Sequence, residues 1–170
     1  ANQVITLKET DANMLVPKLA IQKTIFRTVD PPISYQHATN NINDFKRQPL
    51  LLTMLTTCGP VMATADVNGD GKEDVFVGGT QGTPGKVFIQ NSRSEFVESV
   101  KSIFNPLHTD ADALFLDTDG DKDLDLYVVS VGYNESTEKD KALQDRLYID
   151  DGAGNFTLST NTLPAMLVSK

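Results

Sequence analysis

Two stretches of this sequence turn from alternating acidic residues into an apolar run within one or two positions. Residues 66–79 read DVNGDGKEDVFVGG, and residues 117–132 read DTDGDKDLDLYVVSVG. Carboxylates packed this closely repel one another, and an apolar strand does nothing to relieve that repulsion. Each acidic run is therefore expected to be a loop that needs a compensating positive charge.

The sequence around each acidic loop repeats in the same order. VMATAD, DVFVGG, KVFIQN and EFVESV surround the first loop, and DALFLD, LDLYVVSVG, RLYIDD and NFTLST surround the second. The loops lie 51 residues apart and the third and fourth runs 60 apart, so nine residues are inserted in VGYNESTEKDKALQDR, where ESTEKDKALQD is compatible with a short surface helix. Four short strands that recur at about 50 residues are typical of β-propeller blades.

We therefore predict an all-β chain with two four-stranded propeller blades, at residues 61–105 and 106–170. Residues 1–60 are expected to form an N-terminal extended segment and linker, which is compatible with the tail of a preceding blade. Closed propellers have about four to eight blades, so two blades indicate a fragment of a larger propeller. A chain studied alone would cover its exposed blade faces by self-association, or residues 1–34 would cap one of them.

Oxygen-bearing residues occupy alternate positions of both loops, a spacing at which side chains converge when the loop curls. Six to eight oxygen ligands suit calcium; magnesium is second choice because it keeps its waters, and zinc prefers nitrogen or sulfur. Two calcium ions are expected as cofactors. The predicted ligands, at positions 1, 3, 5, 7 (through the main-chain carbonyl) and 9, are Asp66, Asn68, Asp70, Lys72 and Asp74 in the first loop, and Asp117, Asp119, Asp121, Asp123 and Asp125 in the second.

Two helical calcium motifs share this opening pattern but differ later. An EF-hand loop needs a glutamate at position 12 and flanking helices, and a dockerin-like loop also needs a ligand there. Position 12 is Val77 in one loop and Val128 in the other, inside β-patterned runs. A solvated acidic turn without a metal remains the alternative.

The loop sequences resemble FG-GAP (VCBS) repeats of integrin α-like propellers, as found in large bacterial surface or secreted proteins. DVNGDGKEDVFVGG follows the pattern D-x-[DN]-x-D-G-x-x-D throughout, and LYIDDGAGNF resembles the turn after the third strand. The resemblance covers residues 35–165. One departure is Lys122, which stands where the first loop has Gly71; a positive φ there would cost a non-glycine residue about 1 kcal/mol.

Composition limits the partners. A net charge of −8 argues against nucleic acid and anionic membrane surfaces, and no run approaches the roughly 18 apolar residues of a membrane span. Cys58 is the only cysteine, which excludes an internal disulfide. The resemblance implies secretion or a cell-surface location, with a signal peptide that was removed or lies outside this chain.

We expect a binding or adhesion module for protein or glycan, in which calcium is structural. No catalytic or cofactor-binding residue is predicted, and the chain is expected not to be an enzyme. His37 and His108 have no paired nucleophile and are interpreted as structural polar contacts, and the strand aromatics as packing between sheets. The alternative is part of a calcium-dependent, lyase-like polysaccharide enzyme whose catalytic residues lie elsewhere.

Overall fold

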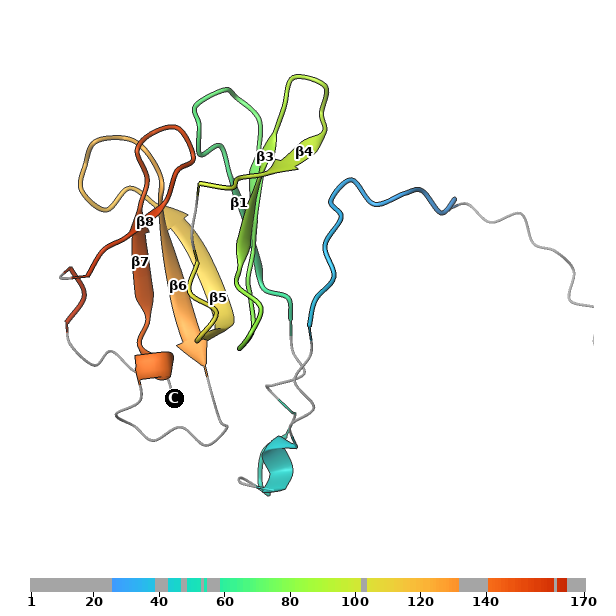
Figure 1. The fold of residues 1–170 in the computed structure, drawn as a ribbon, viewed down its shortest axis with the longest axis vertical. Coiled ribbons are helices and arrows are strands. Elements are labelled where there is room, and N and C mark those ends of the chain that lie inside the picture. Colours follow the sequence, from blue (N-terminus) through green and yellow to red (C-terminus); the bar gives the residue numbers. More distant parts are fainter. Residues whose placement is uncertain are drawn as a thin grey trace, which may run out of the picture. The chain divides into compact units, whose positions relative to one another are not determined.

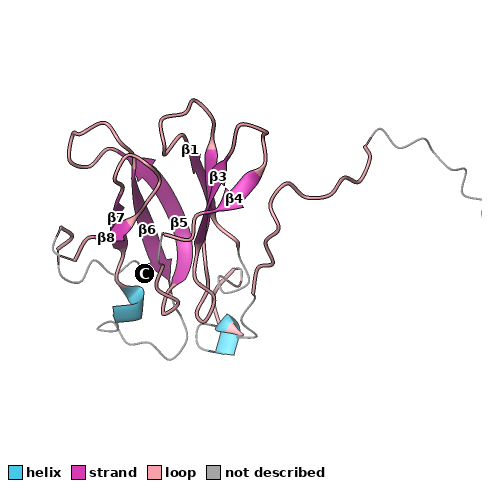
Figure 2. Ribbon diagram, turned by 45° about the horizontal axis from the view of Figure 1, so that its top comes forward, coloured by secondary structure: helices cyan, strands magenta, loops and turns pink. Residues whose placement is uncertain are grey.

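The structure is a computed structural model that describes residues 26–38, 43–46, 49–52, 54, 59–101, 104–131, 141–160 and 162–164. The chain divides into residues 1–30 and residues 31–170, and all the strands named below lie in the second part. The described residues form β-strands with two short 3-10 helices, η2 (Asp44–Lys46) and η3 (Lys141–Leu143) (Figure 2). None of the described helices is long and apolar enough to cross a membrane.

Eight strands form two four-stranded antiparallel sheets, each in chain order (Figure 1). The predicted all-β fold with two blade-like sheets is confirmed, because every predicted β-run contains a strand. Blade 1 consists of β1 (Met62–Ala65), β2 (Asp74–Val77), β3 (Lys86–Gln90) and β4 (Phe96–Glu98). Blade 2 consists of β5 (Thr109–Leu116), β6 (Asp125–Val131), β7 (Arg146–Ile149) and β8 (Thr157–Leu158).

The register is the same in both blades at the loop that joins their first two strands. Ala65 pairs with Asp74 at the end of β1, and Leu116 pairs with Asp125 at the end of β5. The acidic loops therefore close equivalent hairpins. Most of the predicted insertion, residues 132–140, lies outside the described residues, as do Cys58 and residues 1–25; η3 follows the insertion directly.

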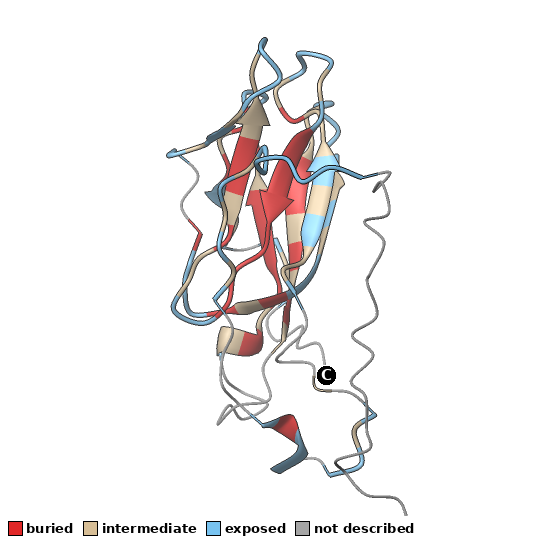
Figure 3. Ribbon diagram, turned by 90° about the vertical axis from the view of Figure 1, so that its right-hand side faces the viewer, coloured by how far each residue is buried: buried red, intermediate tan, exposed pale blue. Residues whose placement is uncertain are grey.

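The main core lies between the two blades, where the apolar face of each sheet covers the other. Phe104, from the connection between the blades, stands between Phe76 and Tyr148, with ring centroids 5.3 and 4.8 Å away. Buried residues are concentrated on β2, β3, β6 and β7, whereas the tips of the acidic loops are exposed (Figure 3). Two strand aromatics that were predicted to pack between the sheets, Tyr148 and Phe156, belong to this core, so the prediction is confirmed for them. The buried residues of the core are Val67, Phe76, Val87, Phe104, Leu126, Val128, Tyr148 and Phe156.

A second apolar cluster covers the outer face of blade 1. Val75, Val77 and Phe88 are buried there, and Ile33 and Tyr35 pack on them. The Tyr35 ring meets Phe88 edge-on, with centroids 6.5 Å apart, and its hydroxyl donates a hydrogen bond of 3.1 Å to the Gly78 carbonyl. Residues 31–38, called the N-terminal strap, thus cover this face; residues 1–25, most of the segment for which the sequence left capping open as the alternative to self-association, lie outside the described residues.

A buried polar contact joins the blades at the end of the sheets where β5 and β7 begin. Asp110 pairs with Arg146 inside blade 2, and both side chains are about 5% exposed or less. The other Asp110 oxygen accepts a 2.6 Å hydrogen bond from the Gly79 amide of blade 1. A Cβ on the neighbouring Gly78 would lie 2.3 Å from Val61 Cγ1 and 2.9 Å from Asp110 Cβ, so the blades approach too closely there for any side chain.

Candidate metal centres

The two acidic loops lie at one end of the blades, together with the turn between β7 and β8 (Figure 1). Each loop leaves the last residue of a blade's first strand and returns at the first residue of its second. This arrangement brings acidic side chains of the β5–β6 loop close to the β7–β8 turn. The opposite end of blade 2 carries the Asp110–Arg146 pair.

In the first loop, the predicted ligands are turned toward the centre of the curl. The Asp66 carboxylate accepts hydrogen bonds from the amides of Asp70 (3.0 Å) and Gly71 (2.8 Å). Asn68 Oδ1 accepts from the Asp70 amide at 3.0 Å. These bonds hold the side chains of positions 1 and 3 on the inside of the loop, where oxygen ligands are needed.

Position 7 of the first loop supplies an internal cation. Lys72 Nζ lies 2.8 Å from Asp70 Oδ2, and the Lys72 amide donates to Asp70 Oδ1 at 2.9 Å. The hydrogen bond from the Lys72 side chain lowers the pKa of Asp70. The ammonium therefore offsets part of the negative charge of this loop.

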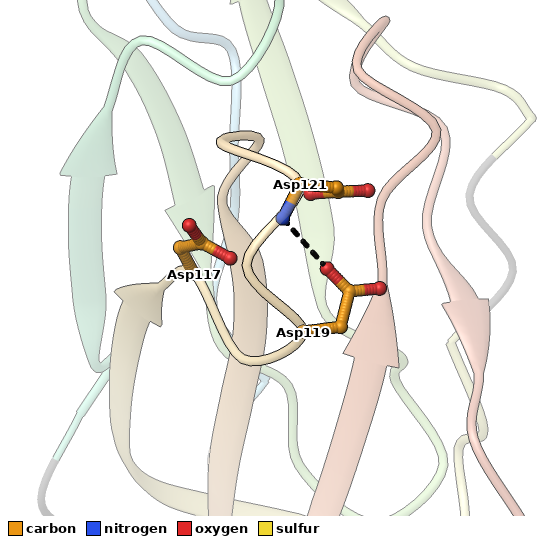
Figure 4. A group of neighbouring side chains, drawn as sticks. All are labelled: Asp117, Asp119 and Asp121. Atoms are coloured by element: carbon orange, nitrogen blue, oxygen red, sulfur yellow. Dashed lines mark hydrogen bonds between the residues drawn. The ribbon is translucent and has the colours of Figure 1, made fainter.

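In the second loop, the carboxylate oxygens of Asp117, Asp119 and Asp121 lie within 4.8 Å of one another (Figure 4). Main-chain amides hold them in place: Gly120 donates to Asp117 at 2.7 Å, and Asp121 donates to Asp119 at 3.2 Å. Among the described residues, this is the one group of three acidic, histidine or cysteine side chains gathered closely enough to hold a metal ion. The predicted positions 1, 3 and 5 are thus brought together.

Position 7 of the second loop adds a further carboxylate to those of positions 1, 3 and 5. Asp123 stands where the first loop has Lys72, and its amide donates to Asp121 Oδ1 at 3.1 Å. The pKa of Asp123 is raised to about 6, first by the hydrogen bond between its carboxyl and that of Asp121, then by burial and by the charges of Asp121, Asp150 and Asp125. Carboxylates this close together repel one another, and a cation beside them would reduce that repulsion.

The two position 9 residues, Asp74 and Asp125, are fully buried beneath their loops. Asp74 accepts hydrogen bonds from the amides of Val67 (3.1 Å) and Gln90 (2.7 Å), so it ties the loop to the end of β3. Burial raises its pKa, and these amides offset part of that rise. Asp125 makes the equivalent contacts with the amides of Thr118 (3.1 Å) and Asp150 (3.0 Å). Both residues therefore anchor the hairpins, and metal ligation by them remains a prediction.

Position 6 has the same backbone conformation in both loops. Gly71 has a φ of +83°, and Lys122 has a φ of +82°. Of the two outcomes open from the sequence, a different loop geometry or a strained lysine, the structure has the strained lysine. A Cβ at Gly71 would have no atom within 4 Å, so the strain at this position lies in the backbone and not in a steric clash with a neighbour.

Sequence reasoning missed the Asp150 carboxylate and the side chain of Asp123. Oδ1 of each is buried and has no hydrogen-bond partner in the described structure. A comparison of the two repeats could have revealed these residues, because blade 1 has Gln90 at the position of Asp150 and Lys72 at the position of Asp123. Orphaned carboxylate oxygens beside an all-oxygen donor set fit a hard cation such as calcium.

Residues 66–128 match a family model described as an FG-GAP-like repeat. This stretch is similar to an FG-GAP-like repeat. The match begins at Asp66, the first residue of the first acidic loop, and ends at Val128 within β6, so it contains both loops. The resemblance predicted from the loop sequences is confirmed. A comparison with curated proteins found no match.

Proposed function

We propose that this chain is a calcium-stabilised propeller module of a secreted or cell-surface protein, and that it acts in binding or adhesion to protein or glycan. The observation that carries the proposal is the convergence of Asp117, Asp119 and Asp121 within 4.8 Å, in a loop of an FG-GAP-like repeat. The equivalent loop of blade 1 directs Asp66 and Asn68 inward in the same way. Two sites built at the same hairpin favour a repeated cation site over a solvated turn.

A bound calcium ion would supply positive charge to these oxygen ligands, and residues of the chain would hold the ion in place. Positions 1, 3 and 5 of each loop, with the carbonyl at position 7 and the position 9 carboxylate, would hold the ion. The buried Asp74 and Asp125 already fix each loop to the third strand of its blade. An ion that joins the upper loop to these anchors would make the hairpin rigid, which is the property that a binding scaffold requires.

Thermal unfolding with calcium and with EDTA tests this proposal. A ligand bound only to the folded state, at a hundredfold excess over Kd, stabilises it by about 2.7 kcal/mol. We expect calcium to raise the melting temperature of the wild type and to have a smaller effect on Asp119→Asn. Asp112→Asn is the matched control, because Asp112 is an exposed acid on β5 outside the loop. Superimposed melting curves together with no saturable heat in calorimetry would refute calcium binding.

Binding to protein or glycan is tested by calcium-dependent retention on immobilised candidate ligands. The scaffold is acidic, with a net charge of −8, so neutral or cationic surfaces are the expected partners. We expect retention by a glycan or protein that is lost in EDTA and restored by calcium. Retention that survives EDTA would separate the binding activity from the acidic loops, and secretion is checked by fractionation of the cells that make the protein.

The buried polar groups support the binding proposal over the enzyme alternative. His108, which precedes β5, and Arg146, which opens β7, lie at the end of blade 2 away from the acidic loops. His108 Nδ1 is 3.0 Å from the Ala142 carbonyl oxygen, and Arg146 pairs with Asp110, so both side chains have structural contacts. A proton-abstracting base beside the proposed cation is what a lyase would need, and an assay of the whole parent protein on acidic polysaccharides tests that alternative.

We also propose that this chain self-associates through the outer face of blade 2. The repeat places Leu114 and Tyr127 where blade 1 has Ala63 and Phe76, which pack on the neighbouring blade. Leu114 is 58% exposed, so within the described part of the chain this face is less covered than its counterpart. A second copy presenting the same face would cover it, because the N-terminal strap already occupies the outer face of blade 1.

A further inference from the structure

We infer that Asn68, at position 3 of the first acidic loop, is a site of spontaneous deamidation, a covalent change that replaces its side-chain amide by a carboxylate. Asn68 is followed by Gly69, and no other asparagine of the chain precedes a glycine. The chemistry itself is independent of metal binding. Only its consequence for the loop rests on the proposed calcium function.

The reaction needs these two residues and water. The Gly69 main-chain nitrogen attacks Asn68 Cγ and forms a C–N bond, and its proton passes to a solvent base. The Cγ–Nδ2 bond then breaks, and Nδ2 takes up a proton from water and leaves as ammonia, so that a cyclic imide remains. Water opens this ring: cleavage at Cγ gives aspartate, and cleavage at the main-chain carbonyl carbon gives isoaspartate. No atom changes its oxidation state.

The loop holds the Asn68 side chain in a way that assists the attack. Asn68 Oδ1 accepts a hydrogen bond of 3.0 Å from the Asp70 amide, so the carboxamide is curled back over its own main chain. Negative charge develops on this oxygen when the nitrogen attacks Cγ, and a main-chain donor at the oxygen stabilises that charge. The two reacting groups also belong to one turn, which lowers the entropic cost of their meeting.

The Gly69 nitrogen is open to the reaction. Gly69 is exposed, and a Cβ there would have no atom within 4 Å. The amides of Asp70 and Gly71 donate to the Asp66 carboxylate, whereas no hydrogen bond holds the Gly69 amide within the described part of the chain. A residue without a side chain leaves the approach to its nitrogen free and can adopt the backbone angles that ring closure requires.

Asn91, in the turn between β3 and β4, provides a comparison within the same molecule. Its Oδ1 also accepts from the amide two residues further on, that of Arg93, at 2.8 Å. The next residue is Ser92, whose side chain crowds the nitrogen that would attack. The Asn91 carboxamide is held at its other end as well, because Nδ2 donates to Glu95 at 3.0 Å. Asn91 therefore combines the same kind of turn with a slower reaction.

The two products change the first loop differently. Aspartate at position 3 gives this loop the residue of the second loop, where Asp119 stands at the same position. Isoaspartate carries the main chain through Cβ and Cγ, so an additional carbon separates position 3 from the rest of the loop. The alternate spacing of the oxygen ligands is then lost. Under the proposed calcium function, deamidation of Asn68 thus alters the first ion site and leaves the second intact.

Incubation of the folded chain in EDTA at neutral pH, followed by peptide mass spectrometry, tests the inference. We expect Asn68 to lose its amide at least about tenfold faster than Asn91, which corresponds to about 1.4 kcal/mol in activation free energy. The Asn68 peptide should separate chromatographically into aspartate and isoaspartate forms, with the Asn68→Asp variant as the reference for the first. Circular dichroism checks that the samples remain folded.

Gly69→Ala is the matched variant, because a Cβ there would meet no atom within 4 Å. It should slow the loss of the Asn68 amide by about tenfold, since the alanine side chain hinders the attacking nitrogen. The comparison with Asn91 needs only the wild type, so it decides the question even if this variant does not fold.

The outcomes separate this inference from the proposed function. Equal rates at Asn68 and Asn91 overturn the inference, and so does a rate at Asn68 that a folded Gly69→Ala variant leaves unchanged. Loss of the amide without isoaspartate also overturns it, because direct hydrolysis gives aspartate alone. The rates are measured without calcium, so a wild type that takes up no calcium would overturn the proposed function and leave the deamidation site standing.

Discussion

Lys122 is one of two described non-glycine residues with a positive φ, the other being Ser94, and replacing Lys122 by glycine should stabilise the protein. Its φ of +82° matches that of Gly71 in the other loop. A left-handed conformation costs an L-residue about 1–2 kcal/mol, whereas the additional freedom of glycine in the unfolded chain costs about 0.4–1 kcal/mol. Lys122→Gly should therefore gain roughly 0.5–1 kcal/mol, or about 1–4 °C in melting temperature for a domain of this size.

Charge complicates this substitution, because Lys122 stands among the acids of the second loop. Lys122→Ala removes the same charge but keeps a Cβ at the strained position, so the difference between the Gly and Ala variants isolates the backbone contribution. The reverse change, Gly71→Ala, meets no steric obstacle, since a Cβ there would have no atom within 4 Å. It should cost about 0.5–1 kcal/mol by the same reasoning, because alanine also lowers the conformational entropy of the unfolded chain.

Chemical denaturation in saturating calcium measures the free energy of unfolding of the Lys122 variants and of Gly71→Ala. Equal slopes of this free energy against denaturant concentration check that the comparison is valid. Calcium is used so that the charge repulsion of the loop is screened in every variant. A Gly variant no more stable than the Ala variant would refute the strain argument. So would a neutral Gly71→Ala, because it would show that the positive φ is not imposed by the loop.

Three further predictions concern the blade interface, the free face and the acidic loop. Asp110→Ala should lower the free energy of unfolding in urea by about 3–5 kcal/mol, because it leaves the buried Arg146 without its carboxylate. Adding Arg146→Met to this variant should restore part of the loss; a double variant that loses the sum of the two single losses would contradict the reasoning. Sedimentation equilibrium at about 100 μM should show association of the wild type and a monomer for Leu114→Lys, whereas a monomeric wild type would end the self-association proposal. In EDTA, the free energy of unfolding should rise on acidification from pH 7 to pH 5. The reason is that the pKa of Asp123 is about 6 in the folded state and 3.8 for the usual carboxyl group, so the folded state takes up the proton at higher pH than the unfolded state. An equal rise in Asp123→Asn would assign the effect to other groups.

The sequence was sufficient to predict the strands and the positions of the loops. Period-two apolar runs and turn residues recur in the same order, and each of the eight predicted runs contains one strand, although β5 begins three residues before its run, at Thr109. The 51-residue offset between loops also appears in the register, because Asp74 and Asp125 pair with the last residues of β1 and β5. Local patterning and short connections determine these features, and both are visible in one chain.

The sequence did not reveal contacts between segments distant in the chain. Nothing near Tyr35 indicates that its ring packs on Phe88 and its hydroxyl reaches Gly78. The burial of Asp74 and Asp125 was also missed, because the acidic spacing suggested ligands alone and gave no sign of the amides that end β3 and β7. Asp150 escaped notice for the same reason: its importance depends on the loop that folds against it.

The N-terminal strap lies on the face of blade 1 where a preceding propeller blade would pack. Blade 2 covers the inner face of blade 1 with Leu126 and Val128 from its second strand, and the equivalent residues of blade 1 are Val75 and Val77. A preceding blade would therefore pack on Val75 and Val77, where Ile33 and Tyr35 now lie. The strap covers that surface with few polar ties, mainly the Tyr35 hydroxyl on Gly78 and the Thr80 hydroxyl on the Ala38 carbonyl at 2.9 Å. Since the strap covers one face and the other exposes Leu114, the proposed pairing between two identical faces would close the assembly at a dimer, whereas head-to-tail stacking would first have to displace the strap.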